Sequence, residues 1–297
     1  MYFCYNYYIN KGKYKEVMNK NFLAGALMGI CLIFAGMILI YNQQKGYSID
    51  IPQPTNQKQP QPLPSFNKDL LLQDINLITN DYPALETGIS VQSYLDNLQI
   101  NINADSNFDA ASTNKLPVAV YALHKIDHGE LSFDTNIYGL SLKETLELMI
   151  IQSDNQAWEN LLSYFGIQTI KEYLAPLGVT SFYNNDQNII SPQDSAKLLR
   201  LSQNGVLGED TAEYLANIMA QSVTGPVTLA TEFANSPKKT GWLDTNYNFV
   251  GIIGKDNKKY SIAIFTKNID GSELDYQAAQ DYINKVLLTI NASLSAN

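Results

Sequence analysis

The sequence predicts an α+β domain with three layers (αβα), in which helices flank a five-stranded antiparallel sheet and an all-helical subdomain is inserted. Two observations on residues 67–297 predict this fold. Apolar and polar residues alternate with the period of strands near both ends of this region, whereas helical periodicity fills its middle. One amphipathic helix also opens the region and another closes it, so that the two ends can share one sheet. A third observation, an apolar segment further upstream, adds an N-terminal transmembrane helix.

Composition is compatible with one sizeable core, because 45% of the 297 residues are hydrophobic and only 16% are charged. Charge is unevenly distributed: residues 1–66 contain six Lys and two acidic residues, whereas residues 67–297 contain 14 Lys and Arg against 27 Asp and Glu. Nucleic-acid binding requires clustered positive charge. The acidic domain therefore argues against a nucleic-acid partner.

Residues 22–41 are predicted to form a membrane anchor. The stretch 22–40 contains 19 uncharged residues, enough for a helix that crosses the hydrocarbon core. Lysines are concentrated before it, which predicts a cytoplasmic segment 1–21 and an extracytoplasmic remainder. A cleaved signal peptide is an alternative, although its apolar part would usually be shorter. A lipoprotein signal at Cys31 is another, although Ile30 stands where a small residue is expected.

A linker, residues 42–66, is predicted to connect the anchor to the domain. Five prolines alternate there with glutamines, and proline-rich chain forms a semi-rigid extended spacer. The segment could alternatively serve as a docking peptide for a partner. Cys4 and Cys31 both precede it, so the domain 67–297 can contain neither a disulfide nor a cysteine metal site.

The first elements of the domain are predicted to be a helix and a hairpin. Apolar residues recur at helical spacing from Asp69 until Pro83. Residues 88–94 and 98–103 then alternate apolar and polar side chains on either side of the turn-forming pair Asp96-Asn97.

Helices are predicted between about residues 112 and 235, and each has a local signal. Gly129 ends the first, Ser141 and Glu144 form a capping box that starts the second, and Ser191-Pro192 starts another. The expected helices lie at 116–128, from 141, at 167–174, from 191, and at 210–221. Strands at 238–244, 249–254 and 260–266 and a helix at 276–290 complete the domain.

A Ser-x-x-Lys motif at Ser112 and Lys115 is the first candidate for chemistry. Side chains three apart at a helix start lie on one face, so the Lys115 amine can reach the Ser112 hydroxyl. A serine hydroxyl needs such help, because it is a weak nucleophile at neutral pH. Alone, the motif is weak evidence, because Ser-x-x-Lys arises by chance in most proteins of this length and the polar first turn of a core helix explains it better.

Two further motifs follow: Ser153-Asp154-Asn155 at the end of a predicted helix and Lys239-Thr240-Gly241 on a predicted strand. With all three motifs in this order, residues 67–297 resemble the β-lactamase-like serine hydrolases, which include class A β-lactamases and penicillin-binding proteins. The resemblance implies the fold predicted above, with the three motifs in a cleft between the sheet and the helical subdomain.

The resemblance also implies catalytic roles. Ser112 would attack a carbonyl, Lys115 in its neutral form would take the hydroxyl proton, and Ser153 would relay a proton to the leaving nitrogen. Burial and a nearby Lys239 would both lower the pKa of Lys115. The backbone amides of Ser112 and Trp242 would form the oxyanion hole.

Substrate binding is assigned in the same way. Asn155 would hold the amide of the substrate's acyl side chain, unless it is simply a helix cap. Lys239 and Thr240 would bind a substrate carboxylate, and Gly241 would let the ligand lie close along the strand edge. The Trp242 side chain would cover the floor of the cleft.

One departure from class A β-lactamases concerns deacylation. Those enzymes use a Glu on a loop that precedes a Ser/Thr-Pro helix start, but residues 178–190 contain no Glu. Asp186 is the only acidic residue there and fits a turn position better. We therefore expect acylation, with an ester that persists as it does in penicillin-binding proteins.

The sequence implies no metal and no organic cofactor. His124 and His128, the only histidines, have a spacing that can bind metal on one helix face. No third ligand is evident, so exposed or capping histidines near a helix end are expected instead. A Ser-His-Asp mechanism would have to recruit one of them, and the sequence lacks a Gly-x-Ser-x-Gly motif to support it.

Three functions are compatible with these residues: a β-lactamase-like hydrolase, a D,D-peptidase or other acyl-transfer enzyme acting on peptidoglycan-like peptides, and a catalytically inactive surface-binding domain. The first two share the nucleophile. The intact set of polar motif residues argues against the third.

Overall fold

The structure is a computed structural model that describes residues 66–255 and 258–295. The predicted cytoplasmic segment and anchor, and all of the linker except Phe66, lie outside the described residues. Within the described part of the chain, none of the helices has the length and apolar character that crossing a membrane requires.

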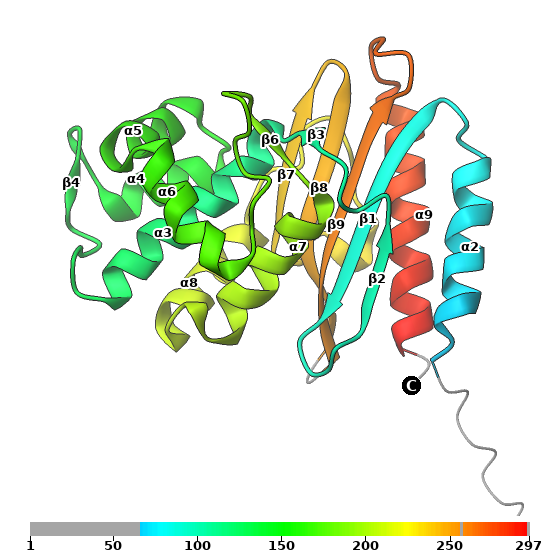
Figure 1. The fold of residues 1–297 in the computed structure, drawn as a ribbon, viewed down its shortest axis with the longest axis horizontal. Helices are drawn as coiled ribbons and strands as arrows, with labels where there is room; N and C mark the ends of the chain where they lie inside the picture. The colour runs from blue at the N-terminus through cyan, green and yellow to red at the C-terminus, as the bar shows by residue number, and fades with distance from the viewer. Residues whose placement is uncertain (1–65, 256–257, 296–297) are drawn as a thin grey trace, which may run out of the picture. The chain divides into compact units, whose positions relative to one another are not determined.

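A five-stranded sheet forms the centre of the domain, and its strand order is β2-β1-β9-β8-β7 with every neighbouring pair antiparallel (Figure 1). The strands are β1 Leu85–Ser93, β2 Gln99–Ile102, β7 Lys238–Leu243, β8 Asn246–Lys255 and β9 Lys258–Asn268. β1, from the start of the domain, pairs with β9, from its end. The predicted sheet built from both ends of the domain is therefore confirmed.

Two hydrophobic clusters pack on opposite faces of this sheet. Successive side chains of a strand point to opposite faces, and β9 shows this clearly. Ile262 and Ile264 join the cluster that includes α2 (Lys68–Asn80) and α9 (Tyr276–Ser295), whereas Ala263 and Phe265 join the cluster of the helical part. Figure 1 shows α2 and α9 side by side on one face and α7 (Pro192–Leu201) on the other. The three predicted layers are thus present.

The helical part lies between β3 and β7 and includes short strands as well as helices. Its main helices are α3 Lys115–Asp127, α4 Leu142–Ile151, α5 Asn155–Phe165, α6 Ile167–Leu174, α7 and α8 Glu209–Ala220. Its irregular turns are η1 Ala111–Asn114, η2 Ala175–Leu177, η3 Ser202–Val206 and η4 Thr231–Phe233.

The inserted subdomain was expected to be all-helical, and this expectation was wrong because the region also contains short strands. β3 (Phe108–Asp109) pairs with β6 (Ile189–Ile190), and β4 (Asn136–Ile137) pairs with β5 (Leu140–Ser141). Two-residue strands are too short to leave an alternating pattern in a sequence.

Local capping signals fix the starts of two helices that position the site. Ser141 accepts a hydrogen bond from the Glu144 amide while the Glu144 carboxylate accepts one from the Ser141 amide, so the predicted capping box starts α4. Ser191 caps α7 ahead of Pro192, also as predicted. The start of α4 matters most, because the turn after this helix carries Ser153.

Candidate active site

Ser112 lies in the tight turn η1, directly before α3. A helical start was predicted here, and the turn proves to be of the 3₁₀ type, in which side chains three apart eclipse each other. This geometry places Lys115 beneath Ser112, and the Lys115 Nζ donates a hydrogen bond to the Ser112 Oγ over 2.7 Å. Ala111, just before the serine, has a φ of 47°, which is uncommon for a residue with a side chain. Residues 110–115, which carry the predicted nucleophile and are here called the nucleophile segment, are therefore held in a strained conformation.

Lys115 makes two further hydrogen bonds, both to the turn between α4 and α5. Its Nζ donates to the Ser153 carbonyl over 2.9 Å and to the Asn155 Oδ1 over 2.7 Å. Ser153 has a φ of 60°, in the left-handed region. The first two motifs predicted from the sequence thus meet at one amine.

Asp154, between these two residues, provides the helix cap of α5. Its carboxylate accepts a hydrogen bond from the Ala157 amide over 2.7 Å. The alternative that Asn155 is the cap is therefore wrong, because Asn155 is the first residue of the helix and its Oδ1 accepts from Lys115 instead.

Burial changes the acidity of both lysines in the site. The Lys115 side chain is buried, and desolvation lowers its pKa to about 8 against the opposing effect of the Asp154 carboxylate. Lys239 is completely buried, and desolvation together with the positive charge of Lys115 holds its pKa well below the usual value. The two amines repel each other when both are charged, as the sequence suggested, so each disfavours the charged form of the other. Both amines are closer to neutrality than ordinary lysines.

Lys239 and Thr240 are close to the other motifs but are satisfied within the protein. The Lys239 Nζ donates to the Ser153 Oγ over 3.0 Å and to the Thr240 carbonyl over 2.8 Å. The Thr240 hydroxyl donates to the Val223 carbonyl over 3.0 Å, and its residue is completely buried. Neither residue lines the cleft described next, although both were expected to contact a carboxylate.

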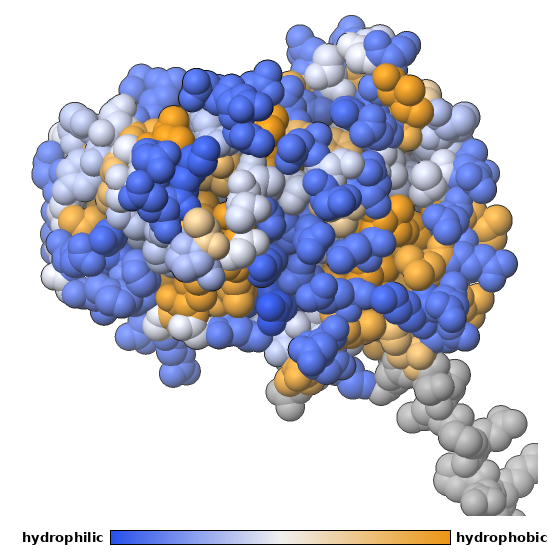
Figure 2. All heavy atoms as spheres, in the orientation of Figure 1, coloured by the Kyte–Doolittle hydropathy of each residue, from blue (hydrophilic) through white to orange (hydrophobic). Residues whose placement is uncertain are grey.

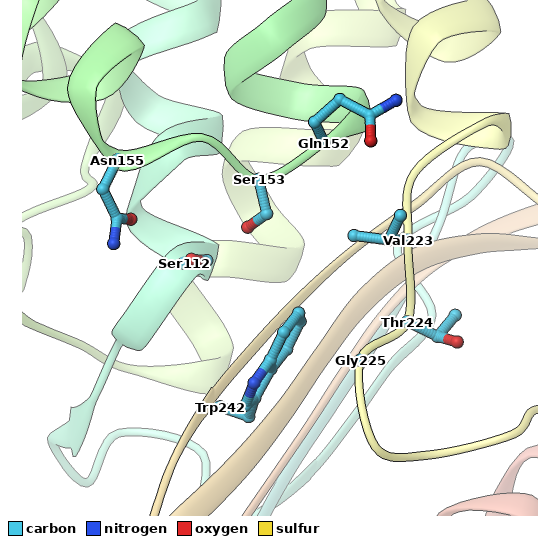
Figure 3. A pocket seen from close by; sticks show the side chains of 8 residues that line it. All are labelled: Ser112, Gln152, Ser153, Asn155, Val223, Thr224, Gly225 and Trp242. Carbon is cyan, nitrogen blue, oxygen red and sulfur yellow. The ribbon is translucent and has the colours of Figure 1, made fainter.

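The cleft beside Ser112 has a volume of about 680 Å³. Ser112 and Ser153 border it on one side, the segment from Val223 to Gly225 borders it on another, and the Trp242 ring points into it from β7 (Figure 3). Gln152 and Asn155 complete the lining. The Trp242 side chain therefore lines the cleft, as the sequence suggested.

Gly241 allows β7 to pack closely on the turn that carries Ser112. A Cβ atom at this position would lie 2.6 Å from the Ser112 backbone nitrogen and 2.8 Å from the Ala110 carbonyl oxygen. Such distances are too short for any side chain, so β7 can approach η1 only if this residue is glycine. The space beside Gly241 is filled by the nucleophile segment, and the expectation that Gly241 also lets a ligand lie along the strand edge stays a prediction.

Two asparagines near the serine were not identified from the sequence. The Asn114 Nδ2 donates to the Asn188 Oδ1 over 2.6 Å, and the Asn188 Nδ2 donates to the Ala111 carbonyl over 3.2 Å. They tie the loop 178–190 to the nucleophile segment. One signal in the sequence could have identified Asn114. It is a polar residue inside the first motif, at a position where an amphipathic core helix does not require a polar side chain.

The remaining residues considered from the sequence lie away from this chemistry. Asp186 is exposed in a turn with a φ of 60°, in agreement with its predicted turn position. The rings of His124 and His128 lie 4.0 Å apart, and a His128 ring nitrogen contacts the His124 carbonyl. No group of three potential metal ligands occurs within the described residues.

Comparison with known proteins places this site in a family. Residues 70–294 match the model of the Beta-lactamase enzyme family, which covers most of the chain. The chain belongs to this family. It is accordingly a serine hydrolase, and the resemblance seen in the three motifs is confirmed.

Solved structures of β-lactamases share the fold. The TLA-1 extended-spectrum β-lactamase superposes with a TM-score of 0.68 at 22% identity, over 76% of this chain and 99% of that one. A β-lactamase from Chitinophaga pinensis gives a TM-score of 0.67 at 22% identity, over 77% of this chain and 100% of that one. The structure of PBP-A gives a TM-score of 0.66 at 22% identity, over 77% of this chain and 97% of that one. No curated protein sequence matches the chain.

The close packing of β7 on the nucleophile segment predicts a specific effect of Gly241→Ala. The added methyl group should push Ser112 away from β7, and a displacement of about 1 Å costs roughly 100-fold in rate. Covalent labelling by a fluorescent penicillin, followed over time, measures this loss.

Gly251→Ala is the matched control, because a Cβ there would lie as close to its neighbours, 2.7 Å from the Phe249 ring and 2.9 Å from the Pro237 carbonyl, but these neighbours do not belong to the nucleophile segment. This control should lower the melting temperature with little change in labelling per folded molecule. Equal effects of the two substitutions on labelling would contradict the role given to Gly241.

Proposed function

We propose that this β-lactamase-family enzyme forms a covalent ester at Ser112 with β-lactams or related amides and releases the acyl group slowly. The observation that carries the proposal is the 2.7 Å hydrogen bond between the Ser112 Oγ and a buried Lys115 whose pKa is lowered to about 8. A lysine can act as a base only in its neutral form, and burial brings that form within reach near neutral pH.

The partners of Lys115 also define how the neutral amine would be oriented. The Ser153 carbonyl and the Asn155 Oδ1 can only accept hydrogen bonds, so they would hold the two N–H groups of a neutral amine. The remaining lone pair then faces the third partner, the Ser112 hydroxyl. Lys115 would take the hydroxyl proton as the Ser112 Oγ forms its bond to the carbonyl carbon.

Departure of the leaving group requires a proton on its nitrogen. The Ser153 hydroxyl borders the cleft and is held by the Lys239 Nζ, so it is placed to give that proton. The backbone amides of Ser112 and Trp242 would stabilise the negative oxygen, since Gly241 brings the two segments into contact.

Substrate binding would use the groups left available after these contacts. The Asn155 Oδ1 is occupied by Lys115, so its NH₂ group would donate to the acyl side-chain amide of the substrate. Lys239 would bind a substrate carboxylate in its protonated form, which the negative charge of the substrate would favour over the neutral amine. Thr240 could donate to that carboxylate only if its hydroxyl turned away from the Val223 carbonyl.

Slow release of the acyl group is proposed from the loop that precedes α7. Residues 178–190 contain no Glu, and the Asn188 side chain is engaged with Asn114 and Ala111. This loop therefore offers no evident base for a water molecule attacking the ester. The same observation favours a second candidate, a D,D-peptidase or acyl-transfer enzyme acting on peptidoglycan peptides, and the fold is also that of PBP-A.

Residues 22–41 are proposed to anchor the enzyme in the cell membrane, with residues 1–21 in the cytoplasm and the hydrolase domain outside. The support is the uncharged stretch 22–40 and the lysines that precede it. The substrates proposed above are compatible with a domain outside the membrane.

The acyl-enzyme is tested by intact-protein mass spectrometry of the full chain after incubation with penicillin. We expect one adduct on Ser112, absent in Ser112→Ala, and a single burst of product from a chromogenic cephalosporin followed by slow turnover. Labelling that survives Ser112→Ala would exclude this nucleophile. Fast turnover would contradict slow release, and cleavage of a D-Ala-D-Ala peptide would support the second candidate.

The pH dependence of acylation tests the role of Lys115. Because the neutral amine is the reactive form, the acylation rate should rise with pH and reach half of its maximum near pH 8. The Asp154 carboxylate raises the pKa of Lys115, so Asp154→Asn, which retains a capping side chain, should move the midpoint to lower pH. Lys115→Ala should slow acylation by roughly 10²- to 10⁴-fold. A rate independent of pH between 6 and 9 would contradict this role.

The anchor is tested by expressing the full chain and a variant that lacks residues 22–41. The full chain should sediment with membranes and resist extraction by carbonate, and protease added to spheroplasts should digest its domain. The shortened variant should stay soluble inside the cell. A full chain found in the cytosolic fraction would refute the anchor, and a shortened mature chain at the cell surface would indicate a cleaved signal instead.

A further inference from the structure

β7 presents alternate side chains to two different parts of the site. Lys239 and Gly241 face the Ser112 side, as described above. Thr240 and Trp242 contact the segment 221–230, here called the wall segment, which includes the cleft residues Val223 to Gly225, and Lys238 contacts residues before and after it. One strand thus supports both the reactive groups and the opposite wall of the cleft.

The wall segment is fixed to the sheet by hydrogen bonds. Lys238 is buried, and its Nζ donates over 2.8 Å to the Ala234 carbonyl and over 3.3 Å to the Ala220 carbonyl, which flank the segment. The Thr240 hydroxyl donates to the Val223 carbonyl over 3.0 Å, and the Tyr247 hydroxyl donates to the Thr224 carbonyl over 2.8 Å. These hydrogen bonds hold the wall segment in place against the sheet, so it forms a defined side of the cleft.

The Trp242 ring rests on Gly225 in this wall. A Cβ atom on Gly225 would lie only 2.6 to 2.7 Å from three carbon atoms of the indole. Gly225 also has a φ of 66°, in the region that favours glycine. The ring is consequently seated against the Gly225 backbone, while part of it lines the cleft near Ser112 (Figure 3).

We propose that the Trp242 side chain determines specificity by limiting the size of the leaving group. This inference rests on the proposed function, in which Lys239 and Thr240 bind the substrate carboxylate. In β-lactams and in peptides ending in D-Ala-D-Ala this carboxylate is on the nitrogen side of the cleaved amide, which is the leaving group. Trp242 shares a strand face with Thr240, so its ring lies on the leaving-group side of the cleft. Compact leaving groups, such as a single amino acid or the five-membered ring of a penicillin, fit this space. A cephalosporin with a large substituent beside its carboxylate meets the indole.

The test compares acylation of the full chain by benzylpenicillin with acylation by a cephalosporin that carries a large 3-substituent. The quantity is the ratio of the two acylation rate constants, measured by intact-protein mass spectrometry. Trp242→Ala should raise the cephalosporin-to-penicillin ratio by about tenfold or more, the scale expected when a steric wall is removed. Trp242→Phe should raise this ratio less. A folding defect would lower both acylation rates by the same factor and would therefore leave the ratio unchanged.

Substitution of Gly225 provides an independent arm. Gly225→Ala should push the ring into the cleft and lower the ratio, whereas Gly225→Ala combined with Trp242→Ala should restore a ratio close to that of Trp242→Ala. Gly129→Ala is the matched control, because Gly129 has a similar φ of 69° but open space where the Cβ would lie. This control should leave the ratio unchanged.

An unchanged or lower ratio in Trp242→Ala would overturn the assignment, and penicillin adducts on the same proteins would show that the proposed function still stands. Failure of the double variant to restore the ratio would also overturn it. If neither substrate acylates the folded wild-type protein, the proposed function falls and the assignment to Trp242 falls with it.

Discussion

The site depends on the burial of two lysine side chains beside one another. Removing an amine from water is unfavourable unless acceptors replace the water, and two neighbouring positive charges also repel each other. The structure surrounds Lys115 and Lys239 with five hydrogen bonds to oxygen atoms drawn from η1, the α4–α5 turn and β7. Burial of the two amines thus has two consequences. It requires η1, the α4–α5 turn and β7 to lie together, and it lowers the pKa of both amines.

Meeting this requirement strains the backbone in two places. Ala111 and Ser153 both have φ values in the left-handed region, a conformation that costs on the order of 1–3 kcal/mol for such residues. Ser153 turns its carbonyl toward Lys115 while its hydroxyl reaches Lys239. Because α4 begins with a capping box and Asp154 caps α5, the helices on both sides hold the strained turn in place.

The sequence predicted those features that have local signals. Helix starts at Ser141 and Ser191 were found because capping side chains act within one turn, and the long strands were found because their alternation repeats. The 3₁₀ turn at Ser112, the Asn114–Asn188 contact and the role of Gly241 could not be predicted. Each depends on a segment remote in the chain, and no pattern within a short window records which backbone will lie 2.6 Å away.

The two faces of β7 also make catalysis and substrate choice separable in part. Lys239 and Gly241 act on the Ser112 side, whereas Trp242 acts on the wall segment, so a change of the indole alters the wall and leaves the contacts of Lys115 in place. Thr240 connects the two functions. Its hydroxyl can reach a substrate carboxylate only by leaving the Val223 carbonyl, two residues from the glycine that seats the indole. Under the proposed roles, carboxylate binding and leaving-group size would therefore both depend on the same short stretch of backbone, from Val223 to Gly225.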